Sequence, residues 1–258
     1  MRLQCAGLTD TGMVRDHNED SFLVSQTESF VVVADGMGGH QSGEVASRMA
    51  INEISAYYDE TLHQTDPIEL ANWPVGRRKP KSREERRLIA ALVRANRVIN
   101  KAAGENPKYS GMGTTCVAAY FVQEGVIIAH VGDSRCYRFR KGVLEQMTED
   151  HSLANEYIRS KILKPEDLPS FPYKNVITRA VGLQESVEVE THFYPHEPGD
   201  IYLLCSDGLS DPVKVPQMTE ILASCGDDLA NACRELIIAA NTNGGPDNVT
   251  ALLARTVY

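Results

Sequence analysis

Several features that would place the chain in other classes of protein are missing from the sequence. No run of about 18 apolar residues occurs, which argues against a membrane-spanning helix. The six cysteines are scattered and form no C-x-x-C pair, so neither a zinc site nor a redox motif is indicated. The N-terminus lacks the long apolar core of a signal peptide. We therefore expect reduced, buried thiols and a cytoplasmic protein.

Motifs of several phosphate-handling enzymes are absent as well. None of the cysteines is followed by an arginine six positions later, which excludes the C-x₅-R site of cysteine-based phosphatases. No G-x-x-x-x-G-K-[ST] loop occurs, and Gly36-x-Gly38-Gly39 lacks the spacing of a dinucleotide-binding fingerprint. The Asp-x-His and Asn-His-Asp/Glu elements of metallophosphoesterases are also missing.

Length and charge favour a single acidic globular domain. The 258 residues, 42% of them apolar, suffice for a sizeable core, and no Ser/Pro/Gly-rich linker divides them. We therefore expect residues 1–258 to form one domain. The formal net charge of −9 disfavours nucleic acid as the main partner, because a phosphate backbone needs compensating Lys and Arg.

The most informative pattern is the placement of aspartates at the ends of apolar segments. Phe30–Ala34 runs into Asp35, Val126–Val131 is followed by Asp133, Ile201–Cys205 is followed by Asp207, and Asp247 opens the segment Val249–Leu253. Core strands that each present a carboxylate at one end can bring these groups together at one rim of a sheet. Crowded carboxylates resist ionisation, and a hard divalent cation removes that penalty. The pattern therefore predicts an Mg²⁺ or Mn²⁺ site.

Hairpin turns are the alternative interpretation of two of these acids. Asp-Gly is the commonest pair in tight turns, so Asp35-Gly36 and Asp207-Gly208 could each be a turn and nothing more. Four acids in similar positions, with a glycine cluster directly after the first, favour the metal site over the turns.

Hydrophobic periodicity indicates helices alternating with antiparallel strands. The expected elements are helices at 42–60 and 82–103 around a Pro- and charge-rich insertion at 61–81, an antiparallel meander at 114–140, a flap at 152–175, and a C-terminal strand, helices at about 215–224 and 228–241, and a last strand. Two helix pairs with antiparallel sheet between them predict a layered α+β sandwich rather than a doubly wound parallel fold.

Eight motifs occur in the order in which they appear in one known family. They are Arg15-Asp16-His17-Asn18-Glu19-Asp20, Asp35-Gly36-Met37-Gly38-Gly39-His40, Gly113-Thr114-Thr115, Gly132-Asp133-Ser134-Arg135, Asp150-His151-Ser152, Thr178-Arg179-Ala180-Val181-Gly182, Ser206-Asp207-Gly208-Leu209 and Gly245-Pro246-Asp247-Asn248-Val249-Thr250. With them the chain resembles the metal-dependent serine/threonine protein phosphatases, the type-2C family, and its bacterial members in particular. The resemblance implies a four-layer α/β/β/α sandwich of two antiparallel sheets flanked by helix pairs.

The resemblance also implies a set of metal ligands for two ions, with a third in bacterial members. It assigns Asp35 as the bridging carboxylate with the Gly36 carbonyl beside it, Asp207 and Asp247 to the first ion, Glu19 to the second through water, and Asp133 with Asp207 to the third. Catalysis would depend on Arg15, Asp35 and Asp207. Arg15 would grip the substrate phosphate, since its planar fork matches two phosphate oxygens.

The implied reaction is hydrolysis of phosphoserine or phosphothreonine on proteins by a metal-activated water, without a covalent phosphoenzyme. The partners implied are phosphorylated proteins and an opposing Ser/Thr kinase, and the chain is expected to act as a monomer away from membranes. A catalytically silent, phosphatase-like binding module is the alternative. That alternative is weakened because such modules typically lose metal carboxylates, and this chain keeps them together with Arg15.

The proton donor to the leaving oxygen is left open by the sequence. Animal members of the family commonly have a histidine directly after the Asp-Gly pair, where this chain has Met37, and a thioether cannot donate a proton. The candidates are His40 and a water on the metal. A role in starting the helix or in packing is the alternative for His40.

Three further groups of residues lie outside the assignments above. We expect His151 to anchor the base of the flap, and we expect no zinc pair at His192 and His196, because the residues between them break helical geometry. A basic group, most simply a solvated loop and helix start, is also a candidate docking surface for an acidic or phosphorylated partner. It comprises Arg77, Arg78, Lys79, Lys81, Arg83, Arg86 and Arg87.

Overall fold

The computed structural model describes residues 2–25, 27–39, 42–63 and 79–257. The strands are β1 (Arg2–Asp10), β2 (Asp20–Val24), β3 (Phe30–Met37), β4 (Gly113–Thr114), β5 (Cys116–Val122), β6 (Gly125–Val131), β7 (Arg135–Arg140), β8 (Val143–Gln146), β9 (Glu190–Pro195), β10 (Ile201–Cys205) and β11 (Val249–Val257). The helices are α1 (Ser42–Thr61), α2 (Arg83–Glu105), α3 (Leu153–Arg159), α4 (Asp207–Ser210), α5 (Val215–Cys225) and α6 (Leu229–Thr242), with 3₁₀ turns η1 (Pro107–Tyr109) and η2 (Pro165–Ser170).

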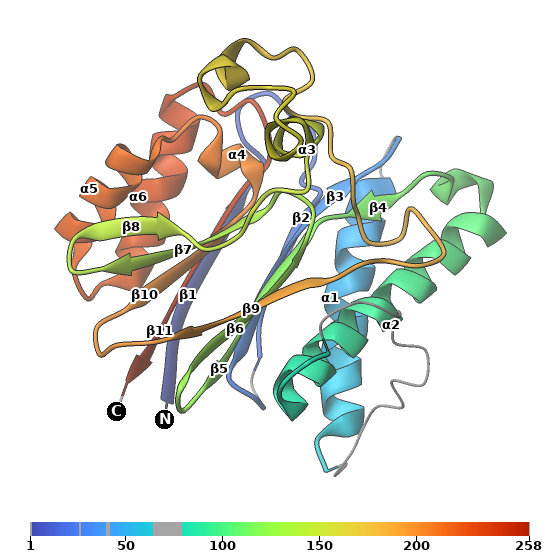
Figure 1. Cartoon of the computed structure of the whole chain (residues 1–258), viewed down its shortest axis with the longest axis horizontal. Coiled ribbons are helices and arrows are strands. Elements are labelled where there is room, and N and C mark those ends of the chain that lie inside the picture. The colour runs from blue at the N-terminus through green and yellow to red at the C-terminus, as the bar shows by residue number, and fades with distance from the viewer. Residues whose placement is uncertain (1, 26, 40–41, 64–78, 258) are drawn as a thin grey trace.

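The strands form two antiparallel sheets that pack face to face. One sheet has the order β1-β11-β10-β7-β8 and the other β2-β3-β5-β6-β9, with β4 added beside β3. Helices α1 and α2 cover the outer face of the second sheet, and α5 and α6 cover the first (Figure 1). This arrangement confirms the expected four-layer sandwich and its two helix pairs.

Strand β3 shows why these sheets are apolar on both faces. Phe30 and Val32 point to the core beneath α1 and α2, whereas Val31 and Val33 point to the core between the sheets. Alternate residues of a strand face opposite ways, so a strand covered on both sides reads as a continuous apolar run. All four side chains are at most 1% exposed.

The prediction of an antiparallel meander at residues 114–140 is wrong for its last strand. Strands β5 and β6 pair in one sheet, but β7 pairs with β10 and β8 in the other. The segment 132–134 is therefore a crossover between the sheets and not a hairpin turn. Gly132 has φ +106°, a left-handed conformation that glycine adopts without strain. The crossover places Asp133 at the rim where the two sheets meet.

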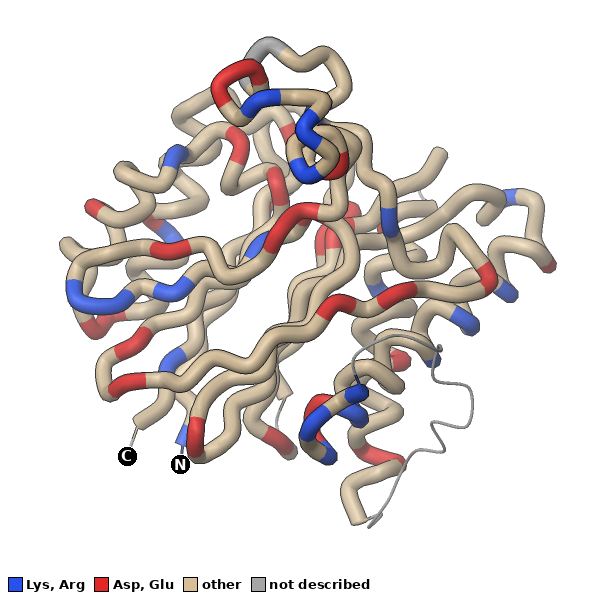
Figure 2. Tube along the Cα trace, viewed as in Figure 1, with Lys and Arg blue, Asp and Glu red and all other residues tan. Residues whose placement is uncertain are grey.

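The basic group at the start of α2 has a different character from the one expected. Lys and Arg positions do gather there (Figure 2), but Arg87 is only 1% exposed and belongs to the interior. It cannot be part of a docking surface. Arg77 and Arg78 lie outside the described residues.

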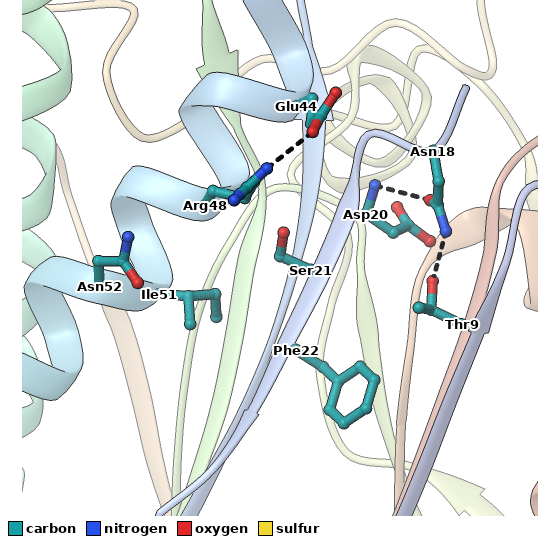
Figure 3. Close-up of a pocket in the computed structure, with 9 residues that line it drawn as sticks. All are labelled: Thr9, Asn18, Asp20, Ser21, Phe22, Glu44, Arg48, Ile51 and Asn52. Atoms are coloured by element: carbon teal, nitrogen blue, oxygen red, sulfur yellow. Dashed lines mark hydrogen bonds and ion pairs between the residues drawn. The ribbon is translucent and has the colours of Figure 1, made fainter. Parts of the chain in front are cut away.

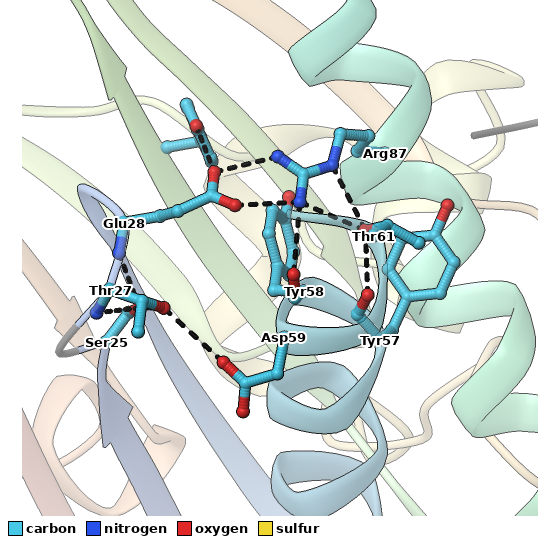
Figure 4. Close-up of polar contacts among 9 residues, drawn as sticks. Ser25, Thr27, Glu28, Tyr57, Tyr58, Asp59, Thr61 and Arg87 are labelled. Carbon is cyan, nitrogen blue, oxygen red and sulfur yellow. Dashed lines mark hydrogen bonds and ion pairs between the residues drawn. The ribbon is translucent and has the colours of Figure 1, made fainter. Parts of the chain in front are cut away.

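A buried ion pair explains the position of Arg87 (Figure 4). Its guanidinium donates to both carboxylate oxygens of Glu28, at 2.7 and 2.8 Å, and to Oγ1 of Thr61 at 3.0 Å. The same group lies over the ring of Tyr58 with 4.5 Å between its Cζ and the ring centroid. The hydroxyl of Tyr120 donates to Glu28 at 2.5 Å. The network ties the turn before β3, the end of α1, the start of α2 and strand β5 together.

The flap predicted at 152–175 lies between β8 and β9 and carries α3 and η2. Its base is closed by backbone hydrogen bonds from Leu153 N–H to the Val176 carbonyl and from Thr178 N–H to the His151 carbonyl, at 2.9 and 2.8 Å. The second of these bonds confirms that His151 anchors the base. Within the described residues no helix has both the length and the apolar character needed to cross a membrane.

Candidate active site

The aspartates predicted from the strand ends meet at one rim of the sandwich. Burial, together with the nearby charges of Asp20, Asp207 and Asp133, raises the pKa of Asp35 well above its usual range. Burial and the charge of Asp207 raise the pKa of Asp133 to about 7. Acidic positions gather at this end of the strands below the segment that carries α3 (Figure 2). The expected cluster of carboxylates is therefore present in the fold.

Asp207 belongs to the same cluster from the other sheet. Burial raises its pKa to about 6, the charges of Asp211 and Asp247 act in the same direction, and a hydrogen bond with Asp35 partly offsets them. Asp35 comes from β3, and Asp207 opens α4, separated by one residue from the end of β10, so the cluster spans both sheets. Asp35 and Asp207, which are 172 positions apart in the chain, therefore share one site.

The hairpin interpretation of the two Asp-Gly pairs is wrong. Strand β3 continues beyond Asp35, and Gly36 pairs with Thr114 of β4. A Cβ atom on Gly36 would lie 2.1 Å from the carbonyl oxygen of Gly43, and one on Gly208 would lie 1.9 Å from that of Asn248. Glycine is therefore needed at both positions for close backbone approach, not for a turn conformation.

Neighbouring threonines hold the backbone of Asp35 in place. The amide of Asp35 donates to Oγ1 of Thr115 at 3.0 Å. Its carbonyl accepts from the Thr115 amide and from Oγ1 of Thr114, both at 2.8 Å. Oγ1 of Thr115 also bonds Oγ of Ser134, beside Asp133, at 2.7 Å. These contacts give the Gly113-Thr114-Thr115 motif a role that the sequence did not reveal, because the pairing is long-range.

Asn248 joins the N-terminal loop to the C-terminal acid. Its side-chain oxygen accepts from the Glu19 amide at 2.8 Å, and its Nδ2 donates to the carbonyls of Thr11 and His17, both at 2.9 Å. Its own amide donates to Oδ1 of Asp247 at 2.8 Å. Through Asn248, Glu19 and Asp247 are placed on the same side of the cluster.

Arg15 lies next to the carboxylates, as a phosphate-binding group should. It donates from Nη2 to Oδ2 of Asp247 at 2.7 Å, and its side chain is 52% exposed. A guanidinium has five N–H donors, so one bond to Asp247 leaves others directed to solvent. The arrangement sets a fixed positive charge at the edge of a negative site.

Asp20 is a member of the cluster that the strand-end pattern does not identify. It is 7% exposed, and its Oδ2 accepts from Oγ of Ser206 at 2.7 Å and from Oγ1 of Thr250 at 2.6 Å. Burial, partly offset by these bonds, raises its pKa to about 7. It also borders a pocket of about 380 Å³ beside α1 and β2 (Figure 3). Asp20 pairs directly with Asp35 across β2 and β3, and this strand register places its carboxylate in the cluster.

The chemistry of the cluster fits a divalent cation. Oδ1 of Asp20 and Oδ1 of Asp133 are buried and have no hydrogen-bond partner among the described residues. The groups that converge are carboxylate oxygens, which Mg²⁺ and Mn²⁺ prefer, and a cation would relieve the repulsion that raises the pKa values. The predicted ligands Asp35, Asp133, Asp207, Asp247 and Glu19 are thus able to hold such ions, and Asp20 is a further carboxylate of the same cluster. His40, the candidate proton donor, lies outside the described residues.

The pKa values predict how metal and pH together set stability. The folded-state pKa of Asp20, Asp133 and Asp207 is about 6 to 7, against 3.8 for a free carboxyl. Their stabilising contribution is therefore complete below about pH 4 and is lost as pH rises through about 7 in the metal-free protein. We expect Mn²⁺ in large excess to raise Tm by about 5–10 °C at pH 7.5, and by less at pH 5.5, where protons compete with the metal.

Calorimetry with EDTA and with Mn²⁺ at both pH values measures this effect. His130 titrates in the opposite sense, since burial lowers its pKa to about 4. Its stabilising contribution is present above about pH 6.5 and is lost as pH falls. This contribution cancels when Tm is compared with and without metal at one pH. An equal gain in Tm at both pH values would contradict the assignment of the carboxylates as ligands.

Comparison with known proteins agrees with this site. The family model for protein phosphatase 2C matches residues 14–243. The serine/threonine phosphatase stp of Listeria monocytogenes is 40% identical over 248 residues, which cover 95% of this chain and 92% of the relative. The crystal structure of the Mycobacterium tuberculosis phosphatase PstP/Ppp superposes with a TM-score of 0.85 at 34% identity, covering 99% of both chains. The catalytic domain of PstP in complex with two manganese ions is also similar, with a TM-score of 0.78, 33% identity and 99% coverage of both chains.

The two sheets bring carboxylates together at one rim, beside Arg15 in the loop between β1 and β2. This site, in a fold shared with phosphatases that include a manganese complex, is that of a metal-dependent phosphoester hydrolase. With the match over most of its length, the chain belongs to the protein phosphatase 2C family.

Proposed function

We propose that the protein hydrolyses phosphoserine and phosphothreonine on other proteins, using two Mn²⁺ or Mg²⁺ ions and in some states a third. Asp35 and the Gly36 carbonyl, with Asp207, Asp247 and Glu19, would hold the two ions, and Asp133 with Asp207 would hold the third. The observation that carries the proposal is the buried group of carboxylates with raised pKa values beside Arg15. The serine/threonine phosphatases among its relatives support the substrate class.

The residues of the chain divide the work between charge and position. Bound divalent ions supply an activated water and offset the charge of the phosphate. The carboxylates fix the number and placement of the ions, and Thr114, Thr115 and Asn248 hold those carboxylates through their backbone. Arg15 orients the phosphate by donating to its oxygens. No side chain need become phosphorylated, because water is the nucleophile.

Peptides of one sequence, phosphorylated on Thr, Ser or Tyr, test the substrate class. With Mn²⁺ and ¹⁸O-labelled water we expect release from the Thr and Ser peptides, with one solvent oxygen in each phosphate after a single turnover. Slower release is expected from the Tyr peptide. Preferential hydrolysis of the Tyr peptide, or phosphate trapped on the protein, would refute the proposal. No release by folded protein in either metal would favour the silent binding module instead.

Arg15 provides a second prediction about this site. We expect Arg15→Ala to lower kcat/KM for the phosphothreonine peptide by about 10- to 100-fold, since a hydrogen bond to a charged group contributes about 1.5–3 kcal/mol. Arg15→Lys should fall between, because it keeps the charge but loses the fork. Steady-state kinetics at saturating Mn²⁺ measure this. Because Arg15 also pairs with Asp247, the half-saturating Mn²⁺ concentration is determined for each variant. A loss of kcat/KM that is restored fully by more Mn²⁺ would contradict a role of Arg15 in phosphate binding.

Four wider features belong to the same proposal. A serine/threonine kinase acts in opposition to this enzyme, since each phosphorylated substrate needs a source. The protein acts as a monomer. It works in the cytoplasm, which is supported by six free cysteines. Residues 1–258 act as one phosphatase domain.

A further inference from the structure

A second group of buried titratable side chains lies at the base of the flap, outside the carboxylate cluster. It consists of His130, His151 and Glu190, whose nearest ligand-type atoms lie within 4.8 Å of one another. The rings of His130 and His151 stack with centroids 4.5 Å apart and an angle of 17° between their planes. His130 is fully buried and His151 is 3% exposed. Nothing in the proposed reaction uses these residues directly.

Their hydrogen bonds determine where the protons lie. The amide of Gly132 is 3.1 Å from Nδ1 of His151, and because an amide can only donate, Nδ1 must accept. The proton of neutral His151 is therefore on Nε2, which donates to Oε2 of Glu190 at 3.2 Å. Nη1 of Arg179 lies farther from the same nitrogen, at 3.4 Å, so the carboxylate is the nearer partner of this N–H. His130 donates from Nε2 to the Glu149 carbonyl at 2.8 Å, so its Nδ1 is unprotonated.

These proton positions disfavour a metal ion at this group. The lone pair on Nδ1 of His151 is engaged by Gly132, and its Nε2 carries a proton. A nitrogen lone pair lies in the plane of its ring, so two nearly parallel stacked rings direct their lone pairs side by side and not to one point. A zinc site needs ligands that converge at about 2.0–2.1 Å. The arrangement instead resembles a carboxylate that orients an imidazole.

The imidazole is directed at the residue before a proposed metal ligand. His151 engages both peptide groups of Gly132: its amide donates to the Gly132 carbonyl at 2.9 Å, and its Nδ1 accepts from the Gly132 amide. Gly132 is tightly enclosed, since a Cβ atom at this position would lie 2.7 Å from the side chain of Thr115. Asp133 follows at once, with its buried Oδ1 unpartnered among the described residues.

We propose that His151 is a positioning residue that fixes the direction of the Asp133 carboxylate, with Glu190 holding the imidazole in the required tautomer. The same residue accepts from the Thr178 amide at 2.8 Å, so it joins the Asp133 crossover to the base of the flap. The inference rests on the proposed function, in which Asp133 binds a metal ion. Groups that orient ligands in this way typically change metal affinity by about 10- to 100-fold when they are removed.

Three variants separate positioning from packing. His151→Leu removes the side-chain bonds to Gly132 and Glu190 and the contact with Arg179. His151→Asn puts an amide oxygen near the place of Nδ1 and so keeps the bond from Gly132, but it cannot reach Glu190. His192→Gln is the matched control, because His192 donates to the other oxygen of Glu190 at 2.8 Å and is 45% exposed.

Two readouts use metal-free protein and do not need activity. ¹⁵N NMR of the wild-type imidazole should show an unprotonated Nδ1 and a protonated Nε2 on His151. Hydrogen exchange of the Gly132 amide should be slow in wild type, His151→Asn and the control, and at least tenfold faster in His151→Leu. The opposite tautomer, or equal exchange in all four proteins, would overturn the proposal even if His151→Leu is too unstable to assay.

Metal titrations supply the remaining readout. Calorimetry and phosphate release should show that His151→Leu raises the Mn²⁺ concentration needed to fill the weakest site by about 10-fold or more. For His151→Asn and His192→Gln this concentration should stay within about threefold of wild type. The kcat of His151→Leu should recover in excess Mn²⁺. Equal losses in His151→Leu and His151→Asn that metal does not restore would overturn the proposal. So would one zinc ion held by wild type and lost on His130→Ala. Absence of turnover in wild type would refute the proposed function alone, since the NMR and exchange results would still stand.

Discussion

Replacing Asp35 by asparagine should abolish most of the activity and at the same time stabilise the metal-free protein. Asp35 is surrounded by the charges of Asp20, Asp207 and Asp133, which together with burial raise its pKa well above normal. Asparagine is nearly the same size but carries no charge, so it removes this repulsion. We expect turnover to fall by about 10³-fold, the scale on which one preorganised group acts on a transition state. Stability sacrificed at a functional site is regained when the site is neutralised.

The two effects are measured on the same preparation. Phosphate release is followed in Mn²⁺, and Tm is determined in EDTA at pH 7.5, which lies above the pKa values of about 6 to 7 of Asp20, Asp133 and Asp207. Asp59→Asn is the control, because Asp59 lies exposed on α1 and its replacement changes the charge equally. We expect the control to leave both quantities unchanged. A lower Tm for Asp35→Asn in EDTA would contradict the view that these acids destabilise the empty site.

The second large effect is expected at the buried pair of Arg87 and Glu28. Arg87→Met removes the guanidinium and leaves the carboxylate of Glu28, only 9% exposed, without its partner. Breaking a buried pair in this way typically costs about 3–5 kcal/mol. Tyr120, Thr61 and the ring of Tyr58 also lose their contacts with the network. We therefore expect a drop in Tm of about 10 °C or more.

Chemical denaturation at pH 7.5 measures the loss against two controls. Arg94→Met removes an arginine from the same helix whose partners Glu53 and Glu60 are more exposed, and it should cost less than about 1 kcal/mol. Replacing both members of the buried pair, as Arg87→Met with Glu28→Leu, should cost less than Arg87→Met alone, because no unpaired charge remains. A similar cost for Arg87→Met and Arg94→Met would show that the network is not a stabilising unit.

Much of this fold could be predicted from local sequence patterns. Helices α1 and α2, α5 and α6 lie where the periodicity placed them, and Ser82 caps α2 by accepting from the Glu85 amide at 3.1 Å. The periodicity reports which face of an element is buried, and this information is local. It cannot report which sheet a strand joins. The local pattern therefore predicts the strand at 135–140 beside its sequence neighbour, whereas this strand pairs across the sandwich with β10.

The carboxylates of the site could be predicted from the sequence, whereas the residues that hold them in place could not. Acids that end apolar strands leave a visible pattern, which identified Asp35, Asp133 and Asp207. Thr114 and Thr115 hold the backbone of Asp35 from 79 and 80 positions away, and Asn248 accepts from the Glu19 amide 229 positions away. Asp20 was missed because its significance lies in its pairing opposite Asp35. Arg87 carries the same charge as Arg83 and Arg86, and only its burial distinguishes it from them.

A titration of metal-free protein with Mn²⁺ tests the central claim most directly. Ions bound per chain and phosphate released from a phosphothreonine peptide are measured in the same samples, for wild type and for Asp35→Asn. The carboxylate site predicts at least two ions bound to wild type, turnover that rises with their occupancy, and weak binding with little turnover in Asp35→Asn. Turnover in EDTA, or wild-type binding and turnover in the folded Asp35→Asn variant, would show that these carboxylates do not form the catalytic metal site.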